Sequence, residues 1–115
     1  MSRAHGDLLV DLREGVRIRV RTGFPLWLRL VLWSEVKGIT LGRRIYLAEG
    51  IEGGALDRLL RHELEHARQI DRIGLATFLF RYLREYFAGR LAGLSHRSAY
   101  YGISFEKEAR EAERV

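Results

Sequence analysis

The chain has 115 residues, of which 47% are hydrophobic, and its formal net charge is +5. This length allows one modest hydrophobic core and excludes two independent domains, so we expect a single domain over residues 1–115. The absence of cysteine excludes a disulfide framework, a thiolate metal site and a cysteine nucleophile.

The N-terminal third predicts one strand and one short helix. Residues 1–15 are weakly patterned and are expected to be peripheral, and they show no signal peptide, so the cytoplasm is the default expectation. Residues 16–21 alternate strictly between apolar side chains and arginines, which predicts a half-buried strand. Residues 24–33 are mostly apolar and contain Pro25 near their start, which favours a short helix.

The middle of the chain predicts a hairpin followed by a long helix. Residues 36–40 and 43–47 are interpreted as two strands that turn at Leu41 and Gly42. A glycine-rich loop over 49–54 leads to a helix from about Ala55 to Arg72, and Gly74 is expected to cap its C-terminus.

The C-terminal part predicts two more helices. Charged residues interrupt the apolar segment 75–91, which therefore indicates a buried or partner-facing helix with its aromatic side chains in the core, with membrane-surface contact as the alternative. Residues 95–102 are interpreted as a connection, after which Ser104 is expected to cap a last helix over 105–113.

The predicted 55–72 helix contains the pattern H-E-x-x-H, with His62, Glu63 and His66 at its defined positions. Residues four apart share one helix face, so the two imidazoles can bind one Zn²⁺ ion. Glu63 can then take a proton from a water molecule that the metal activates. These three residues border the helix's apolar stripe, where a purely structural helix has little use for them. The stripe consists of Leu56, Leu60, Leu64 and Ala67.

A catalytic zinc site commonly has three protein ligands, so a third must come from elsewhere in the chain. The downstream candidates are His96, Glu106 and Glu108. The metzincin pattern is excluded, because Gln69 and Arg72 occupy the positions at which it requires glycine and a third histidine.

Two segments resemble the gluzincin metallopeptidases, in particular the single-domain minigluzincins. They are the H-E-x-x-H segment with Gln69 just after it, and residues 106–109 on the C-terminal helix; the hairpin over 38–47 adds to the likeness. The resemblance implies a zincin-like α+β fold with Glu106 as the third ligand, because Ala109 lies where the family has a small residue. Arg110 departs from the family's acid or amide at the next position, which leaves the partner of a ligand histidine unassigned.

The function implied is a zinc-dependent peptide hydrolase in which His62, His66 and Glu106 hold the metal and Glu63 is the base. The resemblance also implies that a peptide substrate lies along an edge strand over 44–47, and that activity is weak or latent, with a terminus in the cleft. A donor to the substrate carbonyl is expected from residues 96–101. The strand residues and the donor candidates are Arg44, Ile45, Tyr46, Leu47, Tyr100, Tyr101, His96 and Arg97.

The alternative function is a zinc-stabilised binding module whose arginines contact nucleic acid or an acidic protein. Arg17, Arg19 and Arg21 would provide such a face. Acidic residues are interleaved with the arginines of the 55–72 helix, and no nucleic-acid motif is present, so a peptide or protein substrate is the expected partner. The oligomeric state is left open.

Overall fold

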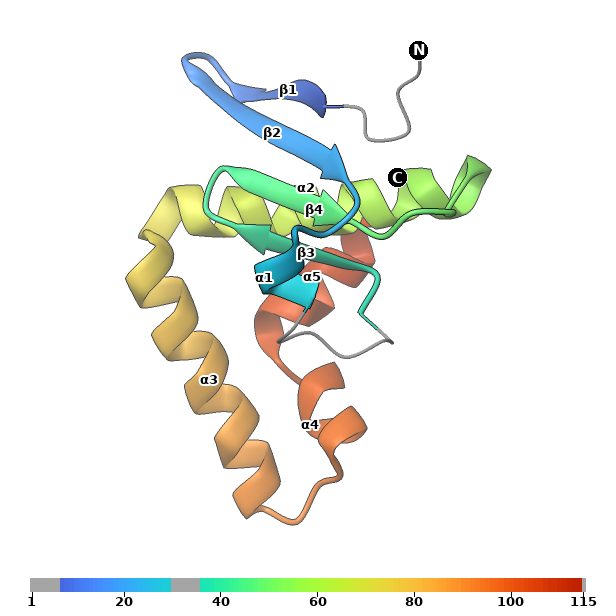
Figure 1. Cartoon of the computed structure of the whole chain (residues 1–115). Helices are drawn as coiled ribbons and strands as arrows, with labels where there is room; N and C mark the ends of the chain where they lie inside the picture. The colour runs from blue at the N-terminus through green and yellow to red at the C-terminus, as the bar shows by residue number, and fades with distance from the viewer. Residues whose placement is uncertain (1–6, 30–35, 115) are drawn as a thin grey trace.

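The computed structural model describes residues 7–29 and 36–114. Within these ranges the chain is an α+β fold with one four-stranded mixed sheet and five helices (Figure 1). The strands are β1 (Asp7–Arg13), β2 (Val16–Thr22), β3 (Gly38–Leu41) and β4 (Arg44–Leu47). The helices are α1 (Leu26–Arg29), α2 (Gly53–Ile73), α3 (Leu75–Leu91), α4 (His96–Tyr101) and α5 (Ser104–Ala112).

The core lies between the sheet and α2, which runs along one face of it (Figure 1). The strand predicted over 16–21 is confirmed as β2, and its apolar residues Val16, Ile18 and Val20 are buried while the arginines between them are exposed. The predicted apolar stripe of α2 is also confirmed, because it packs on this buried cluster. Removing these side chains from water is the main favourable contribution to folding.

The predicted hairpin is confirmed, with β3 and β4 antiparallel and Gly42 in the turn at φ 65°. The prediction that residues 44–47 form an edge strand is wrong. The sheet order is β1-β2-β4-β3, so β4 lies inside the sheet, parallel to β2, and β3 is the edge strand. Ile45, Tyr46 and Leu47 are all buried, which is typical of a strand covered on both faces.

The N-terminal residues differ from expectation, because residues 7–13 form β1 and pair with β2 antiparallel. Val10 and Leu12 point to the core, whereas Leu9 on the opposite face is 56% exposed. The apolar Leu9 obscures the alternation in the sequence. Of the helix predicted over 24–33, the described part contains α1, and residues 30–33 lie outside the described residues.

The two long helices lie as predicted, with Gly74 between them at φ 86° and its N–H donating to the Ile70 carbonyl. α3 then runs away from the sheet, and α4 returns beside it (Figure 1). Phe78 is buried against α2 and α5, but Phe80 and Phe87 are exposed, so the prediction that the aromatic residues of α3 belong to the core is only partly right. No helix among the described residues is both long and apolar enough to cross a membrane.

Residues 95–102 are not an irregular connection, because they contain the short helix α4. Ser95 caps this helix through a hydrogen bond that its Oγ accepts from the Ser98 N–H. The predicted cap at Ser104 is wrong as well: Ile103 is the N-cap of α5 and Ser104 is its first residue. The Ser104 N–H and hydroxyl instead donate to the Glu85 carboxylate of α3, at 2.7 and 2.9 Å. Glu85 on α3 therefore provides the hydrogen-bond acceptors for two donors at the N-terminus of α5.

Replacing Glu85 with alanine should destabilise the protein by about 1–3 kcal/mol, because two donors at a helix N-terminus lose a charged acceptor. The free energy of unfolding in urea measures this change. Glu111→Ala is the control: Glu111 forms a surface pair with Arg114 at 3.5 Å, which is worth at most about 1 kcal/mol. Equal stability losses in the two variants would contradict the role of Glu85.

Candidate metal centre

Two helices bring His62, His66 and Glu106 together, although Glu106 is 40 or more residues from both histidines in sequence. Nε2 of His62 lies 2.9 Å from one carboxylate oxygen of Glu106, and Nε2 of His66 lies 3.1 Å from the other. One ligand atom from each residue lies within 4.8 Å of the others. A compact His/His/Glu cluster is therefore present where the sequence predicts the three metal ligands.

The outer ring nitrogens of both histidines have oxygen partners. Nδ1 of His62 lies 2.6 Å from a carboxylate oxygen of Glu113, and Nδ1 of His66 lies 2.9 Å from the side-chain oxygen of Gln69. Gln69 is fully buried, and its amide nitrogen donates to the Phe105 carbonyl. Such partners fix the orientation of a ligand imidazole, and they keep both Nε2 atoms directed at Glu106.

The Glu106 carboxylate is the centre of the cluster, with only 3% of the residue exposed. It also accepts hydrogen bonds from the hydroxyls of Tyr82 and Tyr100, at 2.5 and 3.1 Å. Burial would raise the pKa of Glu106, but hydrogen bonds from His62 and His66 outweigh burial and hold the pKa well below its usual value. Glu106 is therefore an ionised carboxylate in a buried site. Burial and the nearby Glu106 charge raise the pKa of both tyrosines, so their hydroxyls stay protonated.

Glu63 lies on the buried side of α2, next to the edge strand β3. The Thr40 hydroxyl contacts the Glu63 side-chain oxygen at 2.7 Å and its backbone carbonyl at 3.0 Å. Burial raises the pKa of Glu63, and the charges of His66 and His62 and the hydrogen bond from Thr40 offset part of this rise. A carboxylate whose pKa is raised holds a proton more readily than an ordinary carboxylate, which suits it to accept a proton and release it again.

The other predicted site residues lie outside the cluster. Glu108 accepts a hydrogen bond from Gln69, and His96 lies 2.8 Å from the Tyr86 hydroxyl. Tyr101 is half exposed, and its ring packs under the guanidinium of Arg110. Of the two predicted tyrosines, only Tyr100 reaches the cluster.

Sequence reasoning assigned no role to four residues that contact the site. Thr40, Tyr82 and Glu113 had no spacing to the motif that could reveal them, because each comes from a different element. Gln69 could have been found, because residues three apart on a helix are neighbours and Gln69 follows His66 at that spacing.

The cluster fits a metal ion held by two imidazoles and a carboxylate. Because each Nδ1 faces an oxygen acceptor, each histidine can carry a proton on Nδ1 and offer its Nε2 lone pair to a metal. Without a metal, each Nε2 faces Glu106 and must carry a proton as well. Burial lowers the pKa of His62, but hydrogen bonds to Glu106 and Glu113 and the charges of Glu106 and Glu63 outweigh burial and raise the pKa to about 9. Burial also lowers the pKa of His66, but the hydrogen bond to Glu106 and the charges of Glu106 and Glu63 outweigh burial and raise it.

The raised pKa of His62 predicts how the stability of the metal-free protein depends on pH. The pKa of His62 rises from 6.5 to about 9 on folding, so its contribution is fully present below pH 6.5 and is lost as pH rises through 9. We expect a loss of about 1–3 kcal/mol across this window. Urea unfolding in the presence of a chelator measures it.

Glu113→Gln provides the control for this pH effect. The variant removes one of the two carboxylates that face His62, so its stability should fall less across the same window. A metal-free protein whose stability stays constant or increases from pH 6.5 to 9 would contradict the assigned protonation.

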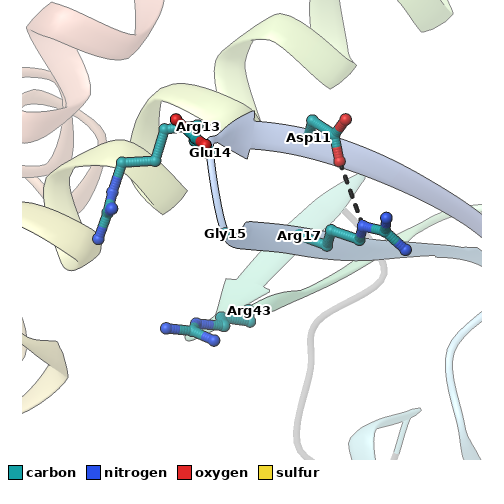
Figure 2. A pocket seen from close by; sticks show the side chains of 6 residues that line it. All are labelled: Asp11, Arg13, Glu14, Gly15, Arg17 and Arg43. Atoms are coloured by element: carbon teal, nitrogen blue, oxygen red, sulfur yellow. Dashed lines mark ion pairs between the residues drawn. The ribbon is translucent and has the colours of Figure 1, made fainter.

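A separate hollow lies between the β1–β2 turn and Arg43, and Figure 2 shows its side chains. Its volume is about 470 Å³. Arg13 pairs with Asp71 at 2.6 Å and Arg17 with Asp11 at 3.4 Å, so two of its three arginines already have acidic partners. None of the predicted metal ligands, catalytic residues or substrate-strand residues lines it, although Arg17 belongs to the arginine face of the alternative function.

No protein-family model matches the chain, and neither a curated protein nor a solved structure matches it. The His/His/Glu cluster and the residues around it are therefore the basis for a functional assignment.

Proposed function

We propose that the protein is a zinc-dependent peptide hydrolase of the gluzincin type. The observation that supports this most strongly is the convergence of His62, His66 and Glu106 beside the buried carboxylate of Glu63. Two imidazoles and one carboxylate are a ligand set that zinc hydrolases use, and it leaves room for a water molecule. The choice of zinc over another divalent metal follows from this ligand type.

Each residue of the cluster has a distinct role in the proposed reaction. His62, His66 and Glu106 hold the metal, which when bound would polarise a water molecule and the substrate carbonyl. Glu63 takes the proton from the attacking water and passes it to the leaving amine. Tyr100, whose hydroxyl is protonated and donates to Glu106 in the metal-free structure, would turn from Glu106 to donate toward the carbonyl oxygen as its charge develops.

A substrate that pairs with the sheet would do so along β3, because β3 and not β4 is the edge strand on this side. Thr40 in β3 contacts Glu63 directly, so an extended peptide on this strand would pass close to the proposed base. Main-chain pairing at an edge favours peptides over compact small molecules as substrates.

The direct test combines metal analysis with an activity assay. Protein purified without added chelator should contain about one zinc per chain by elemental analysis. It should cleave an unstructured protein or a quenched fluorescent peptide library, lose activity with a chelator, and regain it with Zn²⁺. Protein without bound metal that also fails to bind added Zn²⁺ would contradict the proposal.

The alternative proposal is a zinc-stabilised binding module for nucleic acid or an acidic protein. It is favoured by the exposed side chains of Arg17, Arg19 and Arg21 on one face of β2. Arg44 of the neighbouring strand β4 lies opposite Arg19 in the strand register. Binding to labelled single-stranded RNA or DNA would then weaken steeply with salt and would survive Glu63→Gln. The absence of any salt-sensitive complex would remove this alternative.

A further inference from the structure

The outer face of α3 exposes a continuous apolar surface. Leu75, Leu79, Leu83, Phe87 and Leu91 follow one another at steps of four, which places them in one row along the helix. Each is more than 40% exposed, and Leu91 is 90% exposed. Phe80 lies beside the row and is 65% exposed. Contiguous apolar surfaces of this kind mark sites of interaction, because isolated soluble domains rarely leave them in water.

The opposite face of α3 is the one that packs on the rest of the described fold. Phe78 and Tyr82 contact the cluster formed with α2 and α5, Glu85 binds Ser104, and Gly89 lies against Ala99 of α4. In Figure 1, α3 projects from the end of α2, with α4 and α5 on one side of it. The apolar row therefore faces away from the described helices and strands.

The charges around this row are almost all positive. Residues 75–103 contain four arginines and a single acidic residue, Glu85, whose carboxylate is already engaged by Ser104. Arg84 and Arg90 are exposed, and the Arg84 guanidinium lies over the ring of Phe80 at 5.8 Å. Basic side chains thus accompany the apolar row along the same face.

From this combination we infer that the outer face of α3 docks on the surface of an anionic lipid bilayer. The leucines and Phe87 enter the boundary between headgroups and acyl chains, and the arginines beside them bind lipid phosphates. A second copy of the chain fits less well, because it would bring further arginines to an apolar interface where no free carboxylate of α3 can pair with them. This docking is independent of the proposed hydrolase activity.

The test is flotation of the full chain with vesicles, measured as a partition coefficient. Vesicles with an equal mixture of phosphatidylglycerol and phosphatidylcholine should bind the protein, and pure phosphatidylcholine should bind it far more weakly. Leu83→Ser with Phe87→Ser should lower the partition coefficient at least about tenfold. Arg84→Gln with Arg90→Gln should lower it about 25-fold, because each arginine near an anionic surface contributes about fivefold.

The matched control is Arg43→Gln with Arg44→Gln, which makes the same change in net charge at exposed positions of the sheet and should leave the partition coefficient unchanged. Far-UV circular dichroism confirms that each variant is folded. Equal losses in the sheet variant and the α3 variant would overturn the inference, because attraction would then depend on overall charge. A dimer that Leu83→Ser with Phe87→Ser dissociates, in a protein that binds no vesicles, would also overturn it and assign this face to a second copy.

Discussion

Replacing Glu63 with glutamine should lower the rate of peptide hydrolysis by about 10²–10⁴-fold while the protein still contains one zinc per chain. Glutamine keeps the shape of the side chain and can still accept the hydrogen bond from Thr40, but it cannot take a proton from water. The turnover rate with a fluorescent peptide, measured together with metal content, separates the loss of the base from the loss of the metal.

Glu65→Gln is the matched control for this variant, because it makes the same chemical change two residues away on the same helix. Glu65 pairs with Arg68 at 3.2 Å on the charged side of α2 and is not part of the His/His/Glu cluster. Its variant should therefore hydrolyse peptides at the wild-type rate. If Glu63→Gln cleaves as fast as Glu65→Gln, Glu63 is not the base.

Replacing Glu106 with glutamine should weaken zinc binding by more than about 100-fold, since the loss of a ligand exceeds the 10–100-fold typical of a ligand's supporting partner. It should also destabilise the metal-free protein by about 3–5 kcal/mol, because the buried imidazole of His66 and the partly buried imidazole of His62 lose the carboxylate that neutralises them. Competition with a zinc-binding dye measures the first effect, and urea unfolding with a chelator measures the second.

Glu108→Gln is the control for this second prediction, because Glu108 is the neighbouring glutamate and was the alternative third ligand. It accepts a hydrogen bond from Gln69 and lies 3.8 Å from Arg72, outside the His/His/Glu cluster. Its variant should keep one zinc per chain and lose little stability. Loss of zinc in Glu108→Gln but not in Glu106→Gln would reassign the third ligand.

The apolar row of α3 and the side of α3 that faces the metal cluster are opposite faces of this helix. Tyr82 points to Glu106, whereas Leu83 and Phe87 belong to the exposed row. Vesicle binding and peptide hydrolysis can therefore be tested independently, with variants that alter one face of α3 and leave the other intact.

Local patterns in the sequence were sufficient to predict most of the elements. The alternation around Ile18 predicted β2, and Gly74 marked the boundary between α2 and α3. The 3.6-residue period of α2 placed its apolar stripe on the sheet, with His62 and His66 beside it. Such patterns are readable because strand and helix periods are set by the backbone within a few residues. Predictions were less accurate where a strongly apolar residue hid the alternation, as at Leu9, or where a helix was only six residues long, as in α4.

The sequence by itself determined that this protein has a helix with two imidazoles on one face and a carboxylate beside that face, because that arrangement depends only on spacing along the chain. Only the tertiary structure decided that β4 lies inside the sheet and β3 at its edge, and that Glu106, Tyr82, Tyr100 and Glu113 surround the two histidines. These contacts join segments far apart in sequence. They depend on how the helices and strands pack their side chains against one another, and packing of this kind has no period that a single sequence displays.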